Sequence, residues 1–133
     1  MPRLLSQANF SNITVASLTT TSVSEVALDV FSKTSFRSVK YQIQVTQGSS
    51  YHTAEFIIVH NGSLTFNTEF AIVKTGNSLA SFDSDISSNN VRLLVTPAST
   101  SSTTLTGMSS SASSLAAASA AIASVRYGVF LLL

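Results

Sequence analysis

The sequence predicts an all-β fold, an antiparallel β-sandwich of the jelly-roll or immunoglobulin-like kind, and two observations lead to this prediction. From Ser35 to Thr103, apolar residues alternate with polar ones, which is typical of strands with one buried and one solvated face. Short groups of Gly, Asn and Ser interrupt the alternation at regular intervals, as they do in sandwiches and barrels. The 133 residues are expected to form a single domain, 1–133, which can bury a core without disulfides or metals.

The first elements are an N-terminal segment and two strands. Residues 1–20 are expected to be an irregular arm or a first strand, and residues 21–98 are expected to be the sandwich body. Within the body, residues 23–31 alternate as a strand, and residues 37–45 have the clearest pattern of the chain. The apolar face of this second strand consists of Val39, Tyr41, Ile43 and Val45.

The middle of the body is expected to be a hairpin. Residues 51–60 place Ala54, Phe56 and Ile58 on one face, but apolar residues on both faces near the end indicate a central or covered strand. Asn61-Gly62 favours a two-residue type I′ turn, because both turn residues need positive φ. In the returning strand one face is apolar apart from Thr68, and this face should be the buried one. It comprises Leu64, Phe66, Phe70 and Ile72.

Two further strands complete the body. Residues 79–86 form one, and residues 91–95 alternate as the other. Pro97 cannot donate a hydrogen bond to a neighbouring strand, so the second strand ends there or lies at a sheet edge. The side chains expected to point inward from the first of these strands are Ala80, Phe82 and Ile86.

The C-terminal third departs from this pattern. Residues 99–124 are rich in Ser, Thr and Ala and are expected to form a loop, a frayed strand or a short Ala-rich helix. Residues 125–133 are expected to be an apolar terminal strand, buried in the sandwich or paired with another subunit. The stretch 115–133 has the length of a membrane span, but Arg126 inside it opposes insertion by about 2.5–3.5 kcal/mol. No membrane partner is therefore expected.

The composition restricts the function. Charged residues make up 10% of the chain and the net charge is +1, which argues against a nucleic-acid partner. Arg37, Lys40 and Arg92 make a small basic patch at most, without interleaved aromatics. A mean hydropathy of +0.35 with so few charges predicts a surface that is largely covered by neighbouring molecules. The absence of cysteine excludes a disulfide scaffold and thiolate metal sites.

The two histidines, His52 and His60, do not suggest a metal site. On one strand they would share a face but lie about 26 Å apart by the rise of a strand. One metal ion cannot use both, so they are interpreted as polar-face or subunit-contact residues. No nucleophile elbow of the G-x-S-x-G type accompanies them. No catalytic, metal-binding or cofactor-binding residue is predicted.

Two clusters of acidic residues are the other candidates for a metal or catalytic site. Asp83 and Asp85, with Asn89 and Asn90, form the best oxygen cluster for Ca²⁺, but the Gly and Glu of an EF-hand loop are missing. We interpret this cluster as a polar strand face that leads into a turn.

Glu55 and Glu69 flank Asn61-Gly62 symmetrically. A two-residue hairpin would bring them close together across the strands, with Lys74 further off. Paired carboxylates are the machinery of a glycosidase, but the chain has no Trp to stack against a sugar. Ion pairs with Arg37, Lys40 or a neighbouring subunit are the favoured interpretation.

Several short motifs follow one another in a specific order between residues 35 and 104. They are Ser35-Phe36-Arg37-Ser38-Val39-Lys40-Tyr41, Gln44-Val45-Thr46-Gln47-Gly48, Tyr51-His52, Glu55, His60-Asn61-Gly62, Glu69-Phe70, Phe82-Asp83-Ser84-Asp85-Ile86 and Arg92-Leu93-Leu94-Val95-Thr96-Pro97. In this order they resemble a β domain in virion proteins of tailed bacteriophages, cyanobacterial phages especially. The resemblance implies a non-enzymatic structural domain located in the virion, in the head or in the tail. The C-terminal third lies outside it and is a candidate for attachment.

Three functions follow from these observations. The first is a virion structural protein, a capsid decoration or cement protein or a repeated tail or baseplate component, whose partners are major capsid or tail proteins and copies of itself. The second is a receptor-recognition module of a tail fibre or spike that binds a host-surface glycan through Tyr41, Tyr51 and Tyr127. The third is a small virion hydrolase that uses Glu55, Glu69, Asp83 and His60. The first is the prediction, because the alternating block holds almost no catalytic groups.

Overall fold

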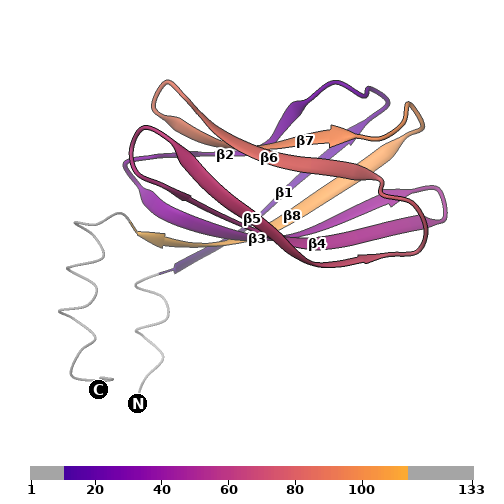
Figure 1. Ribbon diagram of the computed structural model, residues 1–133, viewed down its shortest axis with the longest axis horizontal. Coiled ribbons are helices and arrows are strands. Elements are labelled where there is room, and N and C mark those ends of the chain that lie inside the picture. Colours follow the sequence, from indigo (N-terminus) through magenta and orange to yellow (C-terminus); the bar gives the residue numbers. More distant parts are fainter. Residues whose placement is uncertain (1–10, 114–133) are drawn as a thin grey trace, which may run out of the picture.

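The computed structural model describes residues 11–113, which form an antiparallel β-sandwich of two sheets. The larger sheet has the strand order β1-β8-β3-β4-β5 and the smaller sheet the order β2-β7-β6. In Figure 1 the strands β2, β6 and β7 lie above β3, β4 and β5. The strands are β1 (Ser11–Thr20), β2 (Val26–Ser32), β3 (Phe36–Gln47), β4 (Ser50–His60), β5 (Thr65–Lys74), β6 (Ala80–Ser87), β7 (Asn90–Pro97) and β8 (Thr103–Ser113).

The predicted sandwich is therefore confirmed. Residues 1–10, the Ala-rich stretch at 114–124 and the apolar end at 125–133 lie outside the described residues, and so do the arm, helix and terminal strand expected there. Within the described residues, the part expected to be either arm or strand, 11–20, is the strand β1, paired with β8 along its whole length. No helix among residues 11–113 has the length and hydropathy needed to cross a membrane.

The core lies between the sheets and consists of the alternating apolar residues that the sequence predicts. The inward faces of β3 and β7 are fully or almost fully buried, and so is that of β4 at Ala54, Phe56 and Ile58. Phe82 and Ile86 of β6 pack against this core as expected. The strand β7 ends at Pro97, although it is the central strand of its sheet.

Of the alternatives expected after Ser99, a loop, a frayed strand or a helix, residues 103–113 adopt the strand. These residues form β8, which lies between β1 and β3 in the larger sheet. Their small side chains weaken the strand pattern, because Ser and Gly contribute little apolar alternation. At Gly107 the absence of a side chain is needed for close packing, because a Cβ there would lie 3.3 Å from a Leu28 methyl carbon and 3.7 Å from the Tyr41 ring.

The β4–β5 connection also differs from the prediction. The strands pair up to His60 and Thr65, so the loop has four residues and not the two of a type I′ turn. Gly62 has a φ of 96°. The Asn61 carboxamide oxygen accepts hydrogen bonds from the backbone N–H groups of Ser63 and Leu64, at 2.9 and 2.8 Å. The side-chain acceptor of Asn61 thus favours the longer turn.

The observed register places the polar face of β5 inside the sandwich. Phe66 and Phe70, expected inside, lie on the outer face of the larger sheet and are 52% and 36% exposed, and Leu64, just before β5, is 61% exposed. Ile72 lies on the inner side of the sheet but is 47% exposed. The inner face carries polar residues instead. Asn67 donates to the Ser84 hydroxyl at 2.6 Å, and Ser84 donates to the Thr65 hydroxyl at 2.9 Å, which joins β5 to β6 across the sandwich.

A second polar contact joins the two sheets. Tyr41 of β3 is completely buried, and its hydroxyl donates to an Asp29 carboxylate oxygen of β2 at 2.8 Å. Burial, together with the neighbouring carboxylate, raises the pKa of Tyr41 well above its usual range. The phenol therefore remains a proton donor to Asp29 at any ordinary pH.

Candidate functional site

The outer face of the larger sheet combines a polar centre with exposed apolar side chains. Strand register places polar side chains of three neighbouring strands side by side at its centre: Lys40 and Gln42 of β3 are flanked by Ser110 and Met108 of β8, and Gln42 lies opposite Glu55 of β4. Because alternate residues of a strand share a face, the polar positions that alternate with the buried core build this surface.

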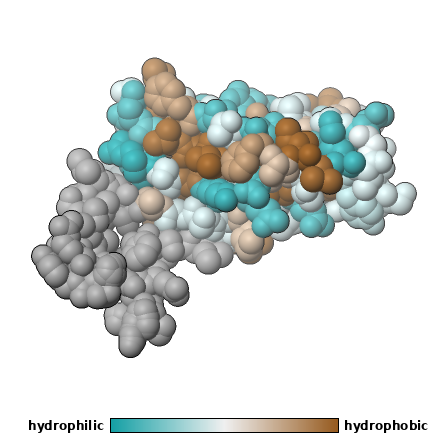
Figure 2. Space-filling model, turned by 60° about the horizontal axis from the view of Figure 1, so that its bottom comes forward, coloured by the Kyte–Doolittle hydropathy of each residue, from teal (hydrophilic) through white to brown (hydrophobic). Residues whose placement is uncertain are grey.

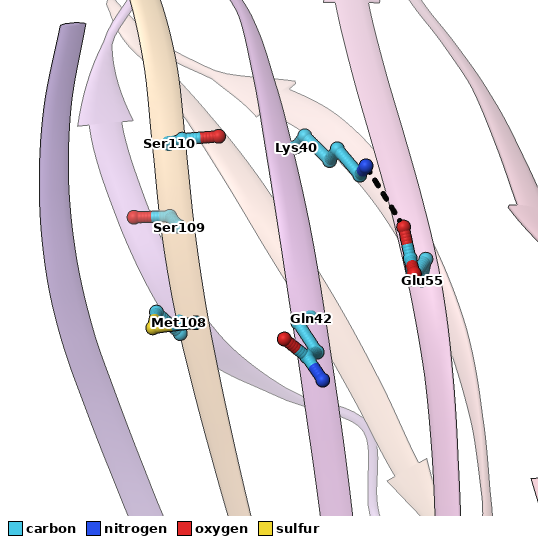
Figure 3. Close-up of a pocket in the computed structure, with 6 residues that line it drawn as sticks. All are labelled: Lys40, Gln42, Glu55, Met108, Ser109 and Ser110. Atoms are coloured by element: carbon cyan, nitrogen blue, oxygen red, sulfur yellow. Dashed lines mark ion pairs between the residues drawn. The ribbon is translucent and has the colours of Figure 1, made fainter.

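An open hollow of about 290 Å³ occupies this polar centre (Figure 3). The Lys40 ammonium pairs with a Glu55 carboxylate oxygen at 2.9 Å on one side of it, and Gln42 and Met108 line it from β3 and β8. A second hollow of about 300 Å³ shares Gln42 and Met108 and extends toward Thr106. An ion pair, a carboxamide and hydroxyl groups can form hydrogen bonds with a polar partner, and the shallow shape suits a flat one.

Beside the polar centre lies an apolar stripe, defined here as Ile57 and Val59 of β4 with Phe66, Phe70 and Val73 of β5. Strand pairing places Val59 opposite Phe66 and Ile57 opposite Thr68, which interrupts the stripe. Phe66 and Val73 are 52% and 67% exposed. Figure 2 turns the bottom of Figure 1 toward the viewer and shows hydrophobic residues gathered in a band along the molecule. Exposed apolar surface gathered on one face is typical of a surface that contacts another molecule.

The expected Glu55–Glu69 pair is wrong. In the observed register Glu55 lies opposite Phe70, and Glu69 lies opposite the buried Phe56, so the two carboxylates are on opposite faces of the sheet. The change from a two-residue to a four-residue loop does not cause this, because it shifts the register by two residues and leaves every side chain on the same face. Glu55 and Glu69 could share a face only in a register shifted by one residue. Of the partners expected for Glu55, the structure shows Lys40.

Both histidines are core residues and not the polar-face or subunit-contact residues that were expected. His52 and His60 share the inner face of β4, and each is 2% exposed. In His60, Nδ1 accepts from the Gly62 N–H at 3.0 Å and Nε2 lies 2.7 Å from the Phe36 carbonyl oxygen, so both nitrogens serve the β4–β5 loop and the start of β3.

Only one of the two ring nitrogens of His52 forms a hydrogen bond within the described residues. Its Nδ1 accepts from the Leu79 N–H at 3.1 Å, whereas its buried Nε2 has no hydrogen-bond partner among the described residues. Its ring packs edge-on against Phe82, with centroids 6.0 Å apart. Burial lowers the pKa of His52, since the interior disfavours the charged imidazolium. His52 is therefore a neutral packing residue of the core.

The acidic cluster of β6 is a polar strand face, as predicted. Two Asp85 oxygens accept from Arg92 at 2.7 and 2.5 Å, and these hydrogen bonds hold the pKa of Asp85 below its ordinary value. Asp83 accepts from the Ser84 N–H at 2.8 Å. Arg92 thus belongs to the smaller sheet, while Arg37 donates to the His60 carbonyl at 3.1 Å in the larger one. The three basic residues do not form one patch. Within residues 11–113, no three His, Asp or Glu side chains come together as a metal site would require.

Tyr41 is not available to a sugar, because it is completely buried. Tyr51, on the outer face of β4, is 46% exposed, and Tyr127 lies outside the described residues. The alternation pattern already indicated which β3 residues face outward. It did not show that Met108 and Ser110 lie beside them, because the sequence assigns no pairing partner to residues 103–113.

The comparisons with known proteins show a likeness in fold. No protein-family model matches the chain, and no curated protein matches it. Among solved structures, the tailspike protein of Acinetobacter phage vB_ApiP_P1 has a TM-score of 0.50 and 15% identity, over 77% of this chain and 22% of the tailspike. The chain thus spans less than a quarter of that tailspike's length. The likeness shows a fold shared with a part of a phage tailspike.

Two further tailspikes have lower scores. The tailspike of Acinetobacter baumannii phage AM24 has a TM-score of 0.48 and 8% identity, over 86% of this chain and 28% of that one. The tailspike gp49 of Acinetobacter baumannii bacteriophage Fri1, described as a capsular polysaccharide depolymerase, has a TM-score of 0.46 and 14% identity, over 84% of this chain and 19% of that one.

Proposed function

We propose that this chain is a structural component of a tailed-phage virion, located in the tail, which acts through protein–protein contacts and not through catalysis. The observation that carries the proposal is the exposed apolar stripe on the outer face of a rigid sandwich. Apolar surface of this extent is unfavourable in water and is stabilised when another protein covers it. The motif order of residues 35–104 and the fold shared with a phage tailspike support a virion partner.

The location is tested by adding the labelled chain to separated phage heads and tails. We expect the chain to sediment with the tails. Sedimentation with the heads would instead favour a capsid decoration or cement protein. Sedimentation with neither heads nor tails would refute a virion role. Replacing Phe66 and Val73 by Ser removes two exposed members of the apolar stripe and should reduce co-sedimentation by at least tenfold. The control replaces Gln44 and Thr106 by Ser on the polar part of the same face and should leave it unchanged.

Catalysis is tested directly, because one similar tailspike is described as a depolymerase. We expect no new reducing ends when the purified chain is incubated with capsular polysaccharide of the host. Hydrolysis that Glu55→Gln, Glu69→Gln or Asp83→Asn abolishes, with folding intact, would refute the non-enzymatic proposal.

Receptor recognition is the second candidate, and the polar hollow favours it. Lys40, Gln42 and Glu55 line an open surface, and Tyr51 is an exposed aromatic on the same face. Carboxamide, charged and aromatic groups of this kind can contact a host-surface glycan. Binding of the labelled chain to host cells that falls at least tenfold in Gln42→Ala and Tyr51→Ala, but not in Phe66→Ser, would favour this candidate over the structural one.

A further inference from the structure

Strand β5 is a free edge of the larger sheet. In the described residues it pairs with β4 on one side and has no neighbouring strand on the other. A free edge exposes unpaired backbone N–H and C=O groups, and proteins usually protect it with charges, prolines or bulges. From Phe66 to Phe70 the outward side chains of β5 are Phe66, Thr68 and Phe70, all exposed and uncharged.

Two of the other edges of the sandwich, β1 and β6, carry polar or charged side chains. The edge strand β6 carries Asp83 and Asp85 on its outward face. The edge strand β1 alternates Val15 with the polar Ser17 and Thr19 on the outer face. The edge strand β2 exposes Val26 and Val30, at 38% and 47%. Compared with these valines, the β5 edge exposes the larger aromatic side chains of Phe66 and Phe70.

The sequence of β5 is complementary to itself. Its outward residues have the order Phe66, Thr68, Phe70, which is symmetric about Thr68. If two β5 strands pair in an antiparallel sense about Thr68, each Phe66 lies opposite Phe70 of the other copy, and the two Thr68 residues lie opposite each other. Aromatic pairs and Thr–Thr pairs directly across an antiparallel ladder are favourable. A two-fold interface needs a surface that matches itself in this way.

Electrostatics and backbone geometry favour the same register. On the inner face, pairing about Thr68 places Asn67 opposite Glu69, so that a carboxamide faces a carboxylate. Pairing about Glu69 would place two carboxylates opposite each other, and pairing about Phe70 would place Lys74 opposite Phe66. Ala71, with a φ of 51°, marks the bulge that ends the regular part of β5.

We propose that two copies of this chain associate by antiparallel pairing of their β5 strands about a two-fold axis at Thr68. The pairing satisfies the free backbone groups of both edges and joins the two larger sheets into one. It does not depend on the location in the virion, and its tests use the purified full-length chain alone.

The first test is a cross-link at the axis. The chain has no cysteine, so Thr68→Cys introduces a single thiol. Directly opposite Cβ atoms of an antiparallel pair lie about 4.5–5.5 Å apart, near disulfide reach. Mild oxidation or a short bismaleimide should convert most of T68C to a covalent dimer. Phe66→Cys alone should not cross-link, because its counterpart would be about 13 Å away, whereas a mixture of F66C and F70C should.

The second test is the mass of the chain in solution. Sedimentation equilibrium should show a dimer for the native chain and at least tenfold weaker association for Thr68→Lys, which places two ammonium groups opposite each other. The control Thr106→Lys adds the same charge to the same outer face, away from the edge, and should remain dimeric. A monomeric native chain, a trimer unaffected by T68K, or equal cross-linking of F66C and T68C would overturn the proposal.

Discussion

Replacing Tyr41 by Phe removes one buried hydroxyl and leaves the ring in place. The hydroxyl is completely buried and donates to Asp29 at 2.8 Å, which joins β3 of the larger sheet to β2 of the smaller. Without it, Asp29 loses a donor and the core gains a small void. The free energy of unfolding should therefore fall, although the apolar packing of the ring is retained.

The size of the loss follows from the surroundings of Asp29. A hydrogen bond to a charged group contributes about 1.5–3 kcal/mol to the free energy of unfolding. Asp29 is only half-buried, so water replaces part of the lost interaction, and we expect a loss near the lower end, about 1.5 kcal/mol. With a urea m-value of about 1.5 kcal/mol/M, the midpoint of unfolding should fall by about 1 M.

The assay is equilibrium urea unfolding followed by far-ultraviolet circular dichroism. Tyr51→Phe is the matched control, because Tyr51 lies on the outer face and is 46% exposed, and its midpoint should not change. A double-mutant cycle with Asp29→Ala should give a coupling energy of about 1 kcal/mol. If Tyr41→Phe unfolds at the same urea concentration as Tyr51→Phe, or if the two losses in the cycle simply add, the contact does not stabilise the sandwich.

Three further predictions concern the core and the Asp85–Arg92 ion pair. Because burial lowers the pKa of His52, the unfolded state binds a proton below about pH 6.5 that the folded state does not. The free energy of unfolding should then fall as the pH drops below that value, and urea titrations should show a weaker pH dependence in His52→Gln. Gly107→Val should lower the free energy of unfolding by about 1–3 kcal/mol, since a Cβ there would lie 3.3 Å from a core leucine methyl. The control Gly76→Val, with open space around the glycine, should show no comparable loss in thermal unfolding. Arg92 lowers the pKa of Asp85. This pair therefore stabilises the fold above about pH 3.9 and loses its effect as the pH falls through the folded pKa. Asp85→Asn should remove that part of the loss of stability in acid.

The success of the sequence analysis differs among the strands for a physical reason. In β3 one face is apolar and the other polar, so only one orientation buries the apolar face, and both the strand and its core residues were predicted correctly. In β8 the inward residues after Leu105 are Gly107, Ser109 and Ser111, whose small side chains give no clear alternation. The Thr residues at the start of β8 were the feature of the sequence that favoured a strand there, because β-branched residues favour strands.

The candidate site was predicted only in part. The outward direction of Lys40 and Gln42 follows from the alternation of β3, and the Lys40–Glu55 ion pair was among the expected contacts. The pairing of Glu55 with Glu69 is wrong because these two residues lie on opposite faces of the sheet, both in the observed register and with a two-residue loop. Only a register shifted by one residue would bring them to one face.

The sequence by itself determined the class of fold and most of the core, because alternation and turn residues are local properties that the chain carries in any context. Only the tertiary structure decided that β8 is a central strand, that both histidines are buried, and that the apolar face of β5 is exposed at a sheet edge. These three outcomes depend on contacts between residues far apart in the chain. Alternation shows that a strand has an apolar face, but only the packing of the other sheet decides whether that face becomes core or an interaction surface.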